Sequence, residues 1–90
     1  MSSEHPYIIG ADYFIRTVTM AQSGKLVKVF QQELVLTNAA WVADTGRFTE
    51  ALASGDFSEV EMFPAGEEVI VGRGAISDAV QIKSLPSVQK

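Results

Sequence analysis

The stretch YFIRTVTMAQSGKLVKVFQQELVLTNAAWV, residues 13–42, decides the fold. It is dense in β-branched and aromatic residues, and the short runs AQSG and QQE divide it into three parts. This pattern predicts an antiparallel meander of three strands, at residues 13–20, 25–30 and 34–42. We expect residues 21–24 to form the first hairpin turn, in which Gly24 adopts a positive φ.

The predicted strands carry apolar residues on both faces. Leu26 and Phe30 share one face of the second strand, while Val27 and Val29 share the other. Such a strand suits a small, strongly curved barrel or a subunit interface better than a flat, exposed sheet. A chain of 90 residues has room for one core, so we expect a single domain over residues 1–90, flexible at 1–6 and 84–90.

In the second half of the chain, the spacing of the apolar residues changes from that of a strand to that of a helix. Apolar residues recur at helical spacing within residues 44–55, which predicts a short helix capped by Asp44 or Thr45 and stopped by Gly55 in the left-handed conformation. We expect Trp41, at the end of the third strand, to pack this helix onto the sheet. Further short strands are predicted at residues 60–63, 67–71 and 75–82.

The composition argues against an enzyme. The chain has no cysteine and one histidine, so it lacks the residues for thiol, histidine or zinc chemistry, and we expect no metal and no cofactor. The acidic pairs Glu59 with Glu61 and Glu67 with Glu68 are interpreted as solvated charges. No apolar run is long enough to cross a membrane, and without a secretion signal we expect a cytoplasmic protein.

The segment VIVGRGAI, residues 69–76, places Arg73 between two glycines. It is not a phosphate loop, because β-type residues rather than a helix follow it. We interpret Gly72 and Gly74 as positions of positive φ in a type II or primed turn. The sequence leaves open whether Arg73 contacts a base, a carboxylate of a neighbouring subunit or only water.

This order of elements resembles the Sm-like family, the small five-stranded barrels that include the Sm, Lsm and Hfq proteins. The segment VTMAQSGKLVKVFQQELVLTNA, residues 18–39, resembles the first half of the family pattern, and Arg73-Gly74 resembles the Arg-Gly step between its fourth and fifth strands. The resemblance implies a mainly β fold: a five-stranded antiparallel SH3-like or Sm-like barrel, with one short helix inserted between strands three and four. It extends to short phage-encoded proteins.

The resemblance also implies a function, which is a homo-oligomeric ring that binds single-stranded RNA without catalysis. The implied RNA-binding residues are Phe30, Gln31, Gln32, Glu33, Arg73 and Gly74. Gln31 and Glu33 stand where the family usually has Asp and Asn, and the Glu33 carboxylate cannot donate to a base and repels phosphate. The net charge of −4 also opposes strong binding to nucleic acid. The alternative is a phage-type structural or regulatory module that binds a protein partner and no nucleic acid.

Overall fold

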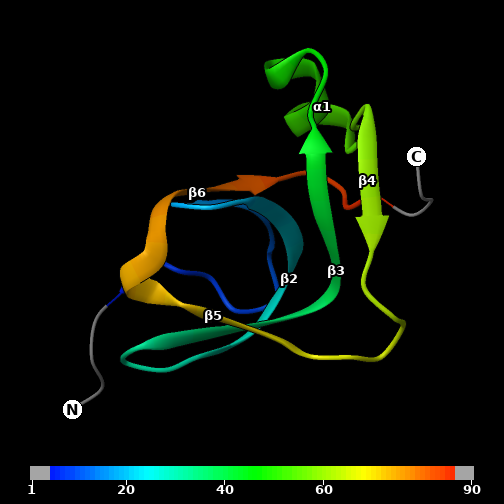
Figure 1. Ribbon diagram of the computed structural model, residues 1–90. Coiled ribbons are helices and arrows are strands. Elements are labelled where there is room, and N and C mark those ends of the chain that lie inside the picture. The colour runs from blue at the N-terminus through cyan, green and yellow to red at the C-terminus, as the bar shows by residue number, and fades with distance from the viewer. Residues whose placement is uncertain (1–4, 87–90) are drawn as a thin grey trace.

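The computed structural model describes residues 5–86. Within them the fold is mainly β, with one short α-helix between the third and fourth strands, as the sequence predicts (Figure 1). The elements are β1 (Asp12–Thr17), β2 (Ala21–Val29), β3 (Glu33–Asp44), α1 (Phe48–Ser54), β4 (Glu59–Met62), β5 (Val69–Gly72), the 3-10 turn η1 (Arg73–Ala75) and β6 (Ile76–Ile82). No helix in this part of the chain is long and apolar enough to cross a membrane.

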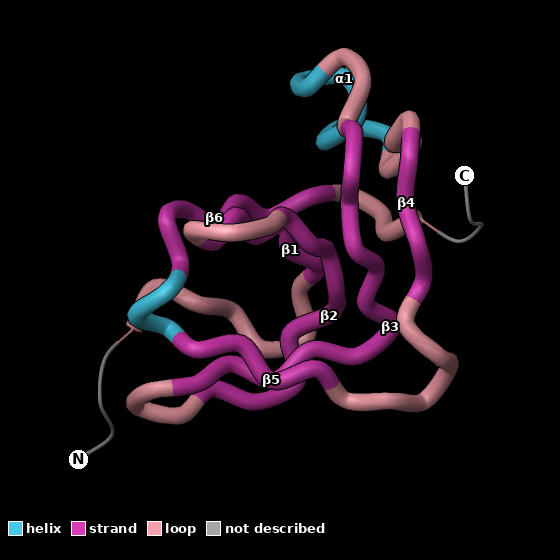
Figure 2. The backbone as a smooth tube through the Cα atoms, in the orientation of Figure 1, coloured by secondary structure: helices cyan, strands magenta, loops and turns pink. Residues whose placement is uncertain are grey.

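The strands form one open antiparallel sheet (Figure 2). It contains the six strands that the residue pattern predicts, one more than the five-stranded barrel that the family resemblance implies. Its order is β4-β3-β2-β1-β6, and β5 also pairs with β3. The additional strand follows from the length of β3, which is 12 residues long. The first part of β3 pairs with β5, and its last part runs on and pairs with β4. Within residues 5–86, β5 and β6 form no ladder with each other, because η1 turns the chain between them.

Two hydrophobic clusters lie on the two faces of this sheet. The inner cluster is enclosed by the curved strands and contains Tyr13, Ile15, Leu26, Leu34, Leu36, Ala39 and Val71. The outer cluster lies beneath α1 and contains Phe14, Ala40, Val42, Ala51, Phe57, Val60 and Ile82. Both faces of β1 are therefore buried, which explains why its sequence shows no apolar and polar alternation.

The first turn lies at residues 18–20, and the prediction that it spans 21–24 is wrong. The Thr17 side chain closes this turn: its Oγ1 accepts a hydrogen bond from the Met20 amide at 3.2 Å. The Thr17 amide in turn donates to the Met20 carbonyl at 2.8 Å. Gly24 lies inside β2 without a positive φ. A side-chain hydroxyl thus supplies the turn that we assigned to a glycine.

The helix α1 begins later than predicted. Its N-cap is Arg47 without a side-chain hydrogen bond, so the predicted cap by Asp44 or Thr45 is wrong. Asp44 Oδ1 instead accepts a hydrogen bond from the Gly46 amide at 2.9 Å and shapes the loop before the helix. The predicted stop is confirmed, because Gly55 has φ 77° and its amide donates to the Ala51 carbonyl at 2.7 Å.

Trp41 does not pack α1 onto the sheet as predicted. It lies on β3 between Ala40 and Val42, which are both buried beneath α1, so its own side chain points to the opposite face. The contact is made by Phe14 of β1, whose ring lies 5.9 Å from that of Phe48 in an edge-to-face arrangement. The segment after β6 also contributes to this region, since Ser84 Oγ donates to the Ser54 carbonyl at 2.8 Å and Leu85 packs against the outer cluster.

An ion pair joins Arg16 of β1 to Asp78 of β6, two directly opposed positions. Arg16 Nε donates to Asp78 Oδ1 at 2.8 Å, and Nη2 donates to Oδ2. Hydrogen bonding to Arg16 holds the pKa of Asp78 below its ordinary value. A carboxyl pKa that is lower in the folded state stabilises the fold at pH values above the ordinary pKa of Asp. This contribution disappears as the pH falls through the folded-state pKa.

We therefore expect the Asp78 carboxyl to titrate at a lower pH in the wild-type protein than in Arg16→Gln. Carbon-detected NMR titration of the side-chain carboxyl measures both values. Identical Asp78 titration curves in the two proteins would show that the ion pair does not form in solution.

Candidate functional site

The β2–β3 loop and η1 lie side by side, although more than 40 residues separate them in the chain (Figure 2). Two hydrogen bonds from one residue join them. The Arg73 amide donates to the Gln32 carbonyl at 2.8 Å, and Arg73 Nη1 donates to the Phe30 carbonyl at 2.8 Å. Glu33, the first residue of β3, pairs with Gly72. These contacts bring together the two segments that contain the six residues singled out from the sequence: Phe30, Gln31, Gln32, Glu33, Arg73 and Gly74.

The loop is a tight hairpin with outward-facing side chains. The Phe30 amide donates to the Glu33 carbonyl at 2.8 Å, which leaves Gln31 and Gln32 at the tip, both exposed. The Phe30 side chain is 52% exposed, so it does not belong to the core. An exposed aromatic ring next to two amides can stack on a flat group while the amides donate and accept hydrogen bonds.

Arg73 is fixed by contacts within its own chain. Besides its bond to the Phe30 carbonyl, the guanidinium lies over the Tyr7 ring, 5.3 Å from the ring centre. A guanidinium has five N–H donors, and the bond to Phe30 uses one of them. Sequence reasoning missed Tyr7, because nothing in the local pattern relates an N-terminal tyrosine to an arginine so far along the chain.

The glycines beside Arg73 serve a different purpose from the predicted one. Gly72 has φ −69° and ends β5, and Gly74 lies in η1, so neither adopts the positive φ of a type II or primed turn. A Cβ atom added at either position would meet no atom within 4 Å. These glycines therefore leave open space on both sides of Arg73, where a flat ligand could approach the backbone.

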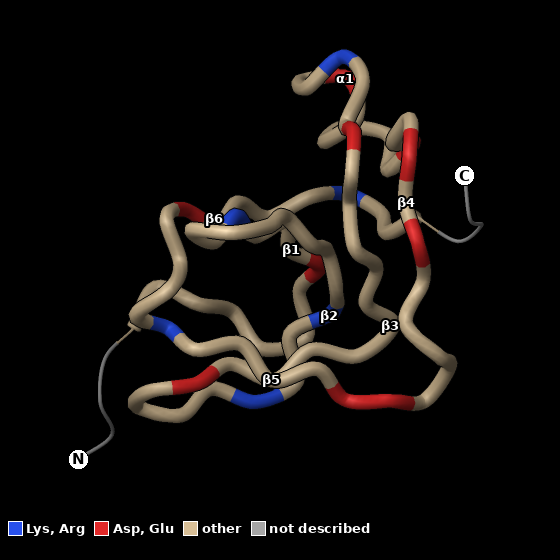
Figure 3. Tube along the Cα trace, viewed as in Figure 1, with Lys and Arg blue, Asp and Glu red and all other residues tan. Residues whose placement is uncertain are grey.

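The charges around this surface are mixed. Figure 3 shows lysine and arginine positions spread over the fold with acidic positions among them. Near the loop, Lys28 Nζ lies 3.9 Å from Glu68 Oε2, and the partly buried Glu33 adds a further negative charge beside Arg73. The surface can hold a neutral, planar group better than a highly charged one.

The acidic residues form no candidate metal centre in the part of the chain that the structure describes. No three potential ligands from His, Asp and Glu stand together there. Glu59 and Glu61 of β4 are exposed, as are Glu67 and Glu68 before β5.

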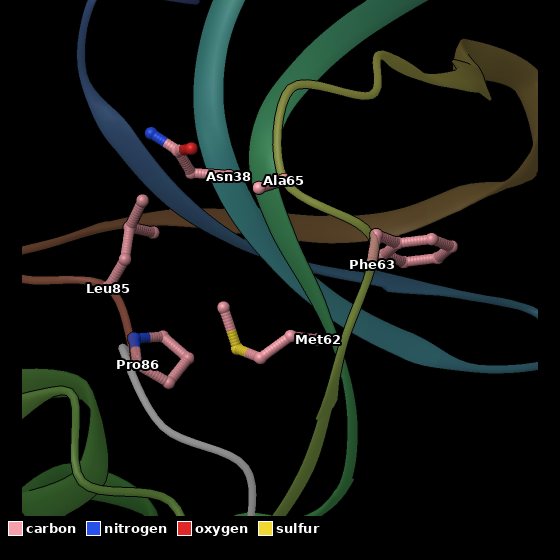
Figure 4. A pocket seen from close by; sticks show the side chains of 6 residues that line it. All are labelled: Asn38, Met62, Phe63, Ala65, Leu85 and Pro86. Carbon is pink, nitrogen blue, oxygen red and sulfur yellow. The ribbon is translucent and has the colours of Figure 1, made fainter.

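A separate apolar cavity of 480 Å³ opens between β3, the segment after β4 and the end of the described chain (Figure 4). Its lining residues are Asn38, Met62, Phe63, Ala65, Leu85 and Pro86. Asn38 has φ 51°, the one non-glycine residue in the described range with a positive φ. None of the predicted site residues lines this cavity, and the spacing of its residues along the sequence gives no signal for it.

Comparisons with protein-family models, with curated proteins and with solved structures found no match for this chain. The case for a function therefore depends on the geometry of the β2–β3 loop, η1 and the sheet edges beside them.

Proposed function

We propose that this chain is a non-catalytic, ring-forming Sm-like protein that binds single-stranded RNA on the surface of the β2–β3 loop and η1. The observation that carries the proposal is the pair of hydrogen bonds from Arg73 to the loop, at 2.8 Å each. These bonds bring an exposed aromatic ring, two exposed amides and a guanidinium with spare donors onto one surface.

The chemistry of this surface suits a nucleotide base. Proteins hold single-stranded bases by stacking them on aromatic side chains or guanidinium planes and by hydrogen bonds to their edges. Phe30 supplies the ring, while Gln31 and Gln32 supply amides that both donate and accept. Glu33 and the net charge of −4 weaken phosphate binding, so we expect modest affinity that falls further as salt rises.

The proposal includes a finer description of the fold. In it, the strands β5, β3, β2, β1 and β6 are the five strands of an Sm-like barrel, and α1 with β4 is an insertion between its third and fourth strands. Their order in the sheet is compatible with this description, because in the described residues β5 pairs only with β3 and β6 only with β1. An edge strand offers unpaired backbone groups to another chain, so β5 of one copy can pair with β6 of the next and close a ring.

We expect Phe30→Ala to lower the affinity for RNA about five-fold or more, because stacking contributes about 1–3 kcal/mol per base. The measurement is fluorescence anisotropy with oligo(U) and oligo(A) at low salt. Trp41→Ala is the matched control, since Trp41 is an exposed aromatic residue in the last part of β3, where it pairs with Gln22 of β2 and Glu61 of β4. Arg73→Ala should also lose binding, but it removes a bond to the Phe30 carbonyl and so perturbs the loop as well.

If the wild-type protein retains neither oligonucleotide at low salt, the RNA-binding proposal is wrong, and the alternative of a protein-interaction module gains support. Equal losses in Phe30→Ala and Trp41→Ala would place RNA on some other surface.

A further inference from the structure

The strands β5 and β6 each pair on one side only within the described residues. The partner of β5 is β3, and the partner of β6 is β1. Each strand therefore presents a row of unpaired backbone N–H and C=O groups, which favours pairing with another chain. Because the two edges are different strands, joining β5 of one copy to β6 of the next is a head-to-tail contact that repeats around a ring.

The outer face of β5 carries an apolar side chain with no cover. Ile70 pairs with Val35 on β3, between residues whose side chains point into the inner cluster. Side chains alternate along a strand, so Ile70 points to the outer face. It is 70% exposed, whereas the next residue, Val71, is 5% exposed. A large apolar side chain this exposed on a free sheet edge marks a contact surface.

The outer face of β6 carries a hollow that α1 helps to form. Val80 pairs with Phe14, whose side chain points into the outer cluster beneath α1, so Val80 shares that face. Beside it lies a hollow of 200 Å³ whose apolar lining comes from Phe48 and Leu52 of α1 and from Ala79 and Val80 of β6. Arg16 and Asp78 also line it, and the Arg16 guanidinium lies 5.2 Å from the centre of the Phe48 ring.

We propose that Ile70 of one copy fills the hollow between α1 and β6 of the next copy. Side chains on one face of a sheet stay on that face across an antiparallel pair, so the outer residue of β5 meets the outer residues of β6. The exposed apolar side chain on β5 of one copy and the apolar hollow beside β6 of the next copy then cover each other. The helix α1 would then contribute to the subunit contact, because its residues line one side of the hollow that Ile70 fills. This inference depends on the proposed ring.

The absence of cysteine in the chain allows a direct test by crosslinking. We prepare two double variants, Ile70→Cys with Val80→Cys and Ile70→Cys with Asp78→Cys, because the outer face of β6 offers both positions. A disulfide requires the two Cα atoms to be about 4.4–6.8 Å apart, which opposed residues of paired strands satisfy. After mild oxidation, at least one double variant should give a covalent ladder of dimers, trimers and larger species on a non-reducing gel. The single variants should give none.

A second measurement uses charge. Ile70→Asp should change the mass in light scattering from that of an oligomer to that of a monomer, without changing the circular dichroism spectrum. Trp41→Asp, at an exposed residue of β3 that pairs with Gln22 and Glu61 and with neither β5 nor β6, should leave the oligomer intact.

The outcomes separate the inference from the proposed function. A wild-type protein that is monomeric at all concentrations overturns both. If the wild-type protein is an oligomer, neither double variant forms a crosslink and Ile70→Asp remains oligomeric, then the contact made by Ile70 is wrong. The proposed ring is not contradicted by that result. Covalent dimers from a single variant would show that like edges pair, which overturns both the inference and the ring.

Discussion

Replacing Phe57 by alanine is expected to lower the free energy of unfolding by about 3–5 kcal/mol, the range for removing a buried phenylalanine. Phe57 is 1% exposed and belongs to the outer cluster. Its ring stacks on that of Phe14, with centres 5.6 Å apart and an angle of 20° between the planes. Phe14 in turn contacts Phe48, so the three rings join α1 and the segment after it to β1. Without Phe57, a cavity would open under α1.

Urea unfolding followed by circular dichroism measures this loss, with every variant at one protein concentration, because the stability of an oligomer depends on concentration. Phe57→Leu serves as the conservative variant and should retain most of the stability. Phe30→Ala is the matched surface control, since the ring at position 30 is half exposed and its loss should cost little. If Phe57→Ala and Phe30→Ala were equally stable, α1 would not be held to the sheet by this cluster.

The role of Phe57 also shows what the sequence pattern omits. It is the one aromatic residue in a short connection, where no periodicity reveals which side chain points inward. The regular elements were predicted better: a mainly β fold, the meander of the first three strands, one helix before the fourth strand and its stop at Gly55 are all present. These features depend on residue type and local spacing, which a sequence carries directly.

The surface formed by the β2–β3 loop and η1 follows from pairing between distant strands. Its six residues could be named together from the family resemblance, and they do lie together. Their local geometry could not be predicted. A glycine on each side of Arg73 suggested positive φ, whereas the chain forms a 3-10 turn held by bonds to Phe30 and Gln32. Such contacts depend on the register of β3 with β5, which no local pattern encodes.

The partner of β4 could not be predicted for a similar reason. The residues of β4 were predicted as a strand, but their partner is the last part of a β3 that is longer than expected. A strand of 12 residues is long enough to pair with two different strands along one edge. The pairing, and not the local sequence, decides where the ladder with one strand ends and the ladder with the next begins.

Gly24→Ala is expected to lower the free energy of unfolding by about 1–3 kcal/mol, as overpacking of a tight core does. Gly24 lies in β2 opposite an irregularity of the β2–β3 ladder, where Ser23 pairs with Ala40 but Lys25 pairs with Thr37. An added Cβ would lie 2.9 Å from the Leu36 Cβ and 3.3 Å from the Ala39 Cβ. Neither atom can rotate away, because a Cβ position is fixed by its own backbone. The strands would have to separate where the inner cluster is most buried.

Gly74→Ala is the matched control for this prediction. Gly74 has no positive φ, and an added Cβ there meets nothing within 4 Å, so the alanine should be neutral or stabilising by up to about 1 kcal/mol. The two variants make the same chemical change at sites that differ in the space around them. Comparing their urea midpoints at equal m-values therefore isolates the effect of packing. If Gly24→Ala were as stable as Gly74→Ala, then β2 and β3 would not approach as closely as the structure has them, and Gly24 would be a turn residue as its sequence context first suggested.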